Sequence, residues 1–100
     1  MPKTVLIAGD RVPMRRSVRF LLERHHAELV VQEAVDGIDA IEKAKKTRPD
    51  LIILDLSMPG LNGAEAATIL RNTPPETPIN LFTMYTDLHA DSLCGFIGLI

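Results

Sequence analysis

The chain has 100 residues, enough for one small domain with a modest hydrophobic core. Hydrophobic residues make up 46% of it and the net charge is −2, which argues against disorder and against bulk electrostatic binding to nucleic acid or anionic membranes. A single cysteine, Cys94, excludes an intrachain disulfide, and no run approaches the roughly 18 apolar residues of a membrane span. We therefore expect one cytoplasmic domain over residues 1–100 with no membrane or direct nucleic-acid partner.

Short apolar runs and amphipathic runs alternate in the first third of the chain. Residues 5–8 form a continuous apolar run, which is typical of a strand covered on both faces. Pro13 stands where a helix favours proline, at its start. Helical spacing then predicts an inner face of Met14, Val18, Leu21 and Leu22 and an outer face of Arg15, Arg16, Arg19 and Arg24. Residues 29–33 predict a second, more polar strand that suits a sheet edge.

The same alternation continues after this strand. Asp36 is expected to cap a second helix that buries Ile38, Ile41 and Ala44 on one face. Residues 51–54 are the most apolar strand candidate, and a turn-rich stretch over residues 57–63 follows it. A helix over about residues 64–71 and a fourth strand over residues 79–84 come next. Thr86 or Asp87 then predicts the cap of a last short helix that reaches about residue 94.

Strands that alternate with helices predict right-handed crossovers, and hence an α/β fold with a parallel sheet covered by helices on both faces. One such unit needs roughly 24 residues, so the chain has room for four units and a fragment. We expect the fifth strand to be short or missing and the fifth helix to be absent. Residues 93–100 form an uncharged apolar tail, and either this tail or an exposed fourth strand is expected to pair with a second copy of the chain.

Polar side chains stand at the ends of three predicted strands. Asp10 follows the first strand, Asp55 closes the third and Thr83 closes the fourth. Because parallel strands end at one edge of the sheet, these side chains are expected to converge. Two carboxylates and a hydroxyl suit Mg²⁺, and a carboxylate can attack phosphorus to form an acyl phosphate. Simpler interpretations are a turn residue for Asp55, a helix cap for Asp10 and an ordinary strand residue for Thr83.

Three segments carry a resemblance to a known family: VLIAGD at residues 5–10, LIILDLSMPGLNG at residues 51–63 and LFT at residues 81–83. Together they resemble the receiver domain of two-component response regulators, of the chemotaxis-regulator-like kind, from about residue 3 to residue 84. The resemblance implies the flavodoxin-like doubly wound parallel sheet, of which we expect the order 2-1-3-4 in a domain that is truncated at its C-terminus.

The resemblance also implies a signalling role rather than an enzymatic one. Asp55 would accept phosphate from a histidine kinase or phosphotransfer protein in a phosphorelay. Mg²⁺ would be held by Asp10, Asp55 and the backbone carbonyl of Ser57. Thr83 corresponds to the family's switch hydroxyl, which follows the phosphoryl group.

Three positions depart from the family pattern. Gly9 stands where receivers carry a first acid, so we expect weak Mg²⁺ binding that Gly9→Asp would tighten. No lysine follows Lys46, whereas the family places one at the end of strand five, and Met84 stands where a small residue is usual. The alternative is therefore a degenerate receiver that acts as a protein-interaction or swapped-dimer module without phosphorylation. A third, weaker hypothesis is phosphotransferase or hydrolase chemistry on an aspartate nucleophile. Such chemistry uses a second aspartate two residues after the first, and position 57 is a serine.

Overall fold

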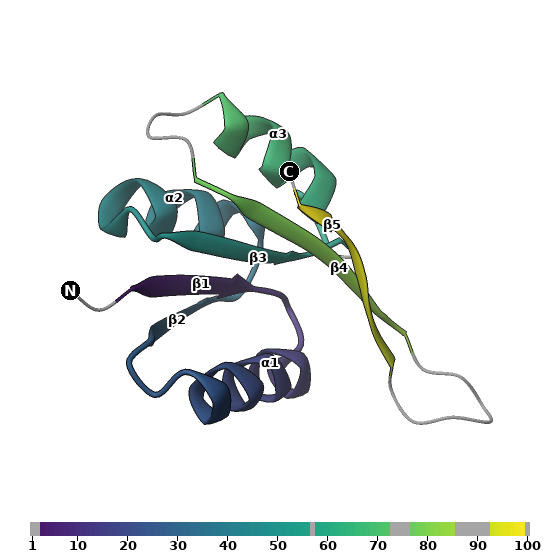
Figure 1. Ribbon diagram of the computed structural model, residues 1–100. Helices are drawn as coiled ribbons and strands as arrows, with labels where there is room; N and C mark the ends of the chain where they lie inside the picture. The colour runs from purple at the N-terminus through teal and green to yellow at the C-terminus, as the bar shows by residue number, and fades with distance from the viewer. Residues whose placement is uncertain (1–2, 57, 73–76, 86–92, 100) are drawn as a thin grey trace.

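A computed structural model describes residues 3–56, 58–72, 77–85 and 93–99, and for residues 82–85 and 93–99 it describes the backbone alone. Five strands form one sheet in the order β2-β1-β3-β4-β5 (Figure 1). The elements in chain order are β1 (Thr4–Ala8), α1 (Val12–His25), β2 (Val30–Ala34), α2 (Gly37–Thr47), β3 (Leu51–Asp55), α3 (Gly63–Arg71), β4 (Ile79–Tyr85) and β5 (Leu93–Leu99). The predicted α/β class and the order 2-1-3-4 are confirmed.

The sheet is covered on both faces, with α2 and α3 on one and α1 on the other (Figure 1). Side chains alternate between these faces along β1, so Leu6 and Ala8 enter the core beneath α2 and α3. Val5 and Ile7 point the other way and pack with Met14 of α1. The first strand is therefore buried on both sides, which explains its continuous apolar sequence.

The pairing of β5 differs from the expectation of a short or missing strand. β5 has 7 residues and runs antiparallel to β4. The interval 86–92 is shorter than the dozen or so residues that a parallel crossover needs, whereas an antiparallel pair tolerates a short connection. Residues 86–92 lie outside the described part, so the cap expected at residue 86 or 87 does too, but Leu93 and Cys94 belong to β5 and not to a helix. Because β4 pairs with both β3 and β5, it offers no free edge for the predicted dimer.

Two helices bury different residues from those expected. In α1, Arg15 is buried and Leu21 is exposed, although the spacing placed them on the opposite faces. In α2, Ile38 is 60% exposed, while Ala40 and Ala44 are buried. Small residues let this helix approach the sheet closely, and its predicted cap is confirmed: the side chain of Asp36 accepts a hydrogen bond from the amide of Asp39 at 2.8 Å. None of the helices in the described ranges is long and apolar enough to cross a membrane.

Candidate functional site

The carboxyl ends of β1 and β3 lie side by side, as the sequence predicts. Ala8 and Leu54 are register partners, so the next residues, Gly9 and Asp55, are neighbours at the edge of the sheet. A Cβ atom placed on Gly9 would lie 3.4 Å from the Cβ atom of Asp55. Asp55 is only 2% exposed, and Asp10, one residue further along, is exposed. A buried carboxylate and an exposed one therefore stand on adjacent strand ends.

The other predicted site residues are placed less completely. The backbone of β4 puts Phe82 in register with Asp55, so Thr83 is the next position along that strand. Met84 follows it within β4 and is in register with Cys94. The side chains of Thr83 and Met84 and the whole of Ser57 fall outside what the structure describes. The strand order brings Thr83 to the same edge as Asp55, and its hydroxyl role stays a prediction.

Met14 occupies the space that a side chain at position 9 would need. A Cβ atom on Gly9 would overlap the terminal methyl group of Met14 and would lie 3.5 Å from its sulfur atom. Met14 is fully buried. An apolar side chain from the first turn of α1 thus takes the place of the acid that the resemblance implies at position 9. The sequence predicted Met14 only as a core residue of the first helix. The small residue Gly9 five positions earlier is compatible with a methionine side chain that packs beside it.

A second contact from α1 fixes the turn after β1. The Nη1 atom of Arg15 donates a buried hydrogen bond of 2.6 Å to the carbonyl oxygen of Gly9. Its Nε atom donates to Glu33 at 2.9 Å, and Nη1 of Arg19 donates to the other oxygen of Glu33 at 2.7 Å. Arg15 was predicted on the solvated face of the helix, and that placement is wrong. Its guanidinium group is buried because it donates hydrogen bonds to Glu33 and to the Gly9 carbonyl. The sequence feature that could have indicated a buried arginine is Glu33, an acidic residue near the end of β2.

The charges around Glu33 alter its acidity. The hydrogen bond from Arg19 is the main cause that lowers the pKa of Glu33; desolvation opposes it, and Arg15 adds to the lowering. Lys43 of α2 donates to the backbone carbonyl of Glu33 at 2.7 Å and pairs with Asp39 at 3.1 Å. The pKa of Asp39 is lowered chiefly by the hydrogen bond from the amide of Val35. These contacts link α1, β2 and α2 beside the site.

The loop after Asp55 is fixed by backbone packing. A Cβ atom on Gly63 would overlap the carbonyl oxygen of Asp55 and would lie 2.8 Å from the Cα atom of Leu56, so only glycine fits there. The amide of Gly63 donates to the carbonyl of Leu56 at 3.2 Å. Asn62 caps α3 by accepting from the amide of Glu65 at 2.9 Å, and the Glu65 side chain accepts from the amide of Asn62 at 3.2 Å. The loop therefore returns directly onto the end of β3.

The two carboxylates at this edge, Asp10 and Asp55, fit the number of protein ligands that Mg²⁺ usually takes. Across the described ranges, no group of three or more histidine, cysteine, aspartate or glutamate side chains is placed to hold a metal ion. Mg²⁺ needs no such cage, because it keeps several waters and binds proteins through one or two carboxylates together with phosphate oxygens. Asp10 and Asp55 supply that number of carboxylates.

Comparisons with known proteins agree on one family. Residues 5–93 match the sequence profile of the response regulator receiver domain. The regulatory protein YhcZ of Bacillus subtilis is 35% identical over 83 residues, which cover 83% of this chain and 39% of YhcZ. The oxygen regulatory protein NreC of Staphylococcus epidermidis is 38% identical, over 83% of this chain and 38% of NreC. The chain thus spans about two fifths of the length of these relatives.

Solved structures show the same likeness in three dimensions. The chemotaxis protein CheY4 of Vibrio cholerae superimposes with a TM-score of 0.77 at 32% identity, covering 88% of this chain and 73% of that one. A two-component response regulator of the LuxR family from Aurantimonas gives a TM-score of 0.76 at 32% identity, covering 85% of this chain and 61% of the other. The match therefore holds for sequence and for fold.

Proposed function

The chain belongs to the response regulator receiver domain family, and on that premise we propose that it is a phosphorelay module in which Asp55 accepts a phosphoryl group. Receiver domains are signalling modules that work with histidine kinases or phosphotransfer proteins. The observation that carries the proposal is the place of Asp55: a buried carboxylate at the carboxyl end of β3, on a loop held against it by Gly63. Asp10 lies at the adjacent strand end, where a second carboxylate is needed.

The chemistry is a substitution at phosphorus. A carboxylate oxygen of Asp55 attacks the phosphorus of a phosphohistidine, the new O–P bond forms as the P–N bond breaks, and the histidine nitrogen leaves with the electron pair. Receiver domains generally bind Mg²⁺ at this pocket, where it offsets the negative charge of the phosphoryl group. Asp10, Asp55 and the carbonyl of Ser57 would hold the ion, and the hydroxyl of Thr83 would bind a phosphoryl oxygen.

Intact-mass spectrometry tests this directly. The protein is incubated with acetyl phosphate at increasing Mg²⁺ concentrations, and one added phosphoryl group is expected. Asp55→Asn should abolish the added mass. Asp50→Asn, at the opposite edge of the sheet, should leave it unchanged, because its amide oxygen can still accept the 2.8 Å bond from the amide of Thr4. Absence of labelling at every Mg²⁺ concentration would overturn the proposal.

A second candidate is an interaction module that works without phosphorylation. Met14 favours it, because its methyl group fills the place of the acid that would help to hold the metal. In that case we expect a dimer through β5, whose outer edge pairs with no other strand of the described sheet. Sedimentation velocity at several concentrations separates the two candidates: a concentration-dependent dimer without labelling supports this one, and a labelled monomer contradicts it.

A further inference from the structure

Phosphorylation of Asp55 would concentrate negative charge at one edge of the sheet. The phosphoryl group and Asp10 are both anionic, and one divalent cation does not neutralise them completely. Preorganised cations or hydrogen-bond donors at such a position stabilise the charge that develops during phosphoryl transfer. This inference rests on the proposed function and asks which basic side chain lies near this edge. The chain has eleven lysines and arginines, and the structure shows the position and any ion-pair partners of each.

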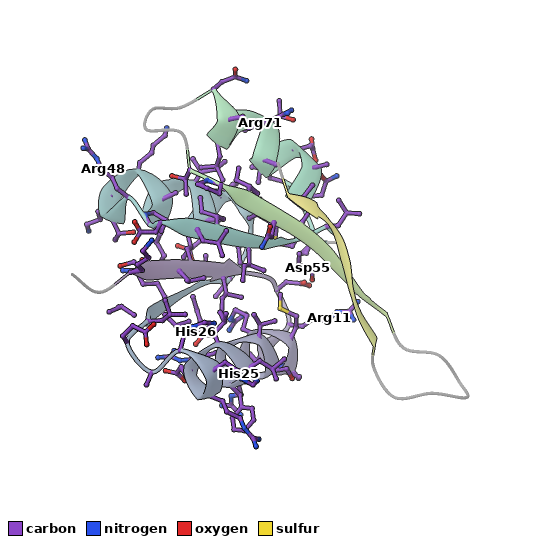
Figure 2. All side chains as sticks on the ribbon, viewed as in Figure 1. Arg11, His25, His26, Arg48, Asp55 and Arg71 are labelled. Carbon is purple, nitrogen blue, oxygen red and sulfur yellow. The ribbon has the colours of Figure 1, made fainter. Side chains whose placement is uncertain are left out.

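Most of them lie elsewhere or have partners. In this fold the helices begin at the carboxyl edge of the sheet and end at the opposite edge, where Arg48 lies, away from Asp55 (Figure 2). Six residues belong to the start of β1 or to the last turns and ends of helices: Lys3, Arg24, Lys45, Lys46, Arg48 and Arg71. Three more are held in the ion pairs around Glu33 and Asp39: Arg15, Arg19 and Lys43. Arg11 and Arg16 remain.

Arg11 has the position that the site requires. It is the residue before the first turn of α1, directly after Asp10, with an extended backbone at φ −101° and ψ 121°. Two peptide units separate its Cα atom from that of Gly9, a span of at most about 7.6 Å. Its side chain caps no helix amide, is exposed and forms no ion pair with any residue that the structure describes. Figure 2 places Arg11 and Asp55 at the same end of the sheet.

We propose that Arg11 binds the phosphoryl oxygens on Asp55 and supplies positive charge to them in addition to that of the metal ion. A guanidinium group presents planar, paired donors that match two phosphate oxygens at once, and it stays charged at every relevant pH. Arg11 follows the exposed Asp10 directly, so its long side chain starts beside the rim of the site. The residue thus completes the site from the loop after β1.

The test compares initial rates of labelling by acetyl phosphate, first at a Mg²⁺ concentration that saturates the wild-type protein and then at higher concentrations. Arg11→Ala is expected to slow labelling by about tenfold or more, the loss of one charge-assisted contact. Arg11→Lys keeps the charge but not the paired geometry, so its rate should lie between those of the wild type and Arg11→Ala. Arg16→Ala, an exposed arginine five residues further along α1, is the matched control and should label at the wild-type rate.

The outcomes separate this inference from the function on which it rests. No labelling of the wild-type protein overturns both. Labelling of Arg11→Ala at the wild-type rate overturns the role of Arg11 alone. Full recovery of the Arg11→Ala rate at higher Mg²⁺ also overturns it, because Arg11 would then act on metal binding and not on the phosphoryl group. Equal melting temperatures of the variants, expected because this side chain makes no cap bond, exclude a folding defect.

Discussion

The loop after β1 and the loop after β3 meet at Asp55, yet they are held by different contacts. In the second loop, Gly63 packs on the backbone of Asp55 itself, and an asparagine–glutamate capping box fixes the helix that follows. In the first loop, the methyl group of Met14 fills the space beside Gly9, and Arg15 binds the Gly9 carbonyl. One loop is fixed by backbone complementarity and the other by side chains.

The two loops therefore contribute differently to the candidate site. The contacts around Gly63 position Asp55, the proposed acceptor, and they depend on a close backbone approach that a Cβ atom would obstruct. The contacts around Gly9 set the charge and the space in which a metal and a phosphoryl group would be bound. A substitution near Gly9 is therefore expected to alter the proposed metal site more than the position of Asp55.

Substituting Gly63 tests the backbone half most severely. Gly63→Ala is expected to cost about 3 kcal/mol of unfolding free energy, since the new Cβ atom meets backbone atoms of Asp55 and Leu56 that cannot move aside cheaply. Urea denaturation measures the loss. Gly60→Ala in the same loop is the control: its φ of 71° is unfavourable for alanine, but no atom lies within 4 Å, so a loss of about 1 kcal/mol is expected. Equal losses would contradict the close packing.

Substituting Arg15 tests the side-chain half. Arg15→Met should destabilise the protein by about 2 kcal/mol, because it removes the donor to the buried Gly9 carbonyl and one of the two arginines on Glu33. The adjacent Arg16 is exposed and forms no ion pair with a described residue, so Arg16→Met should change stability by less than about 0.5 kcal/mol. A variant as stable as the wild type would show that the ion pair only offsets its own desolvation.

The acid dependence of stability should report the same cluster with a smaller effect. The folded-state pKa of Glu33 lies below its usual value of 4.5, so its contribution is present above pH 4.5 and is lost as the pH falls through the folded-state pKa. Glu33→Gln should therefore flatten the acid limb of stability, measured by urea denaturation from pH 7 to pH 3. Glu42→Gln, an exposed glutamate of α2, should leave the limb unchanged. An unchanged limb in Glu33→Gln would show that other acids determine it.

The sequence predicted the elements that depend on local patterns. Continuous apolar runs located β1 and β3, and Asp36 marked the start of α2. Strand direction alone predicted that the carboxyl ends of β1 and β3 lie at one edge of the sheet, with Asp10 and Asp55 directly at those ends. These elements are predictable because they depend on the periodicity and helix-capping residues of short segments, and both can be seen in one sequence.

The features that were missed depend on tertiary partners. Arg15 was assigned to solvent because its helix position gives no sign of the Gly9 carbonyl that it meets, and Ile38 was assigned to the core although alanines make the close contact. β5 pairs antiparallel with β4, and the sequence could not show this because an apolar run has the same pattern in both directions. Met14 as the neighbour of Gly9 likewise requires the orientation of α1 on the sheet.

Restoring the absent acid should give the smallest effect, and the structure explains why. In Gly9→Asp alone, the new side chain must displace the methyl group of Met14, a movement that the flexible end of the chain allows at some cost in packing. We expect Mg²⁺ affinity to rise only about threefold, or roughly 0.7 kcal/mol, by calorimetric titration. In a Met14→Ala background the same substitution has free space and should tighten binding further, while Met14→Ala alone should not. Equal gains in both backgrounds would show that Met14 does not restrict the pocket, and the proposed metal site would then differ from that of a complete receiver in its charge and not in its space.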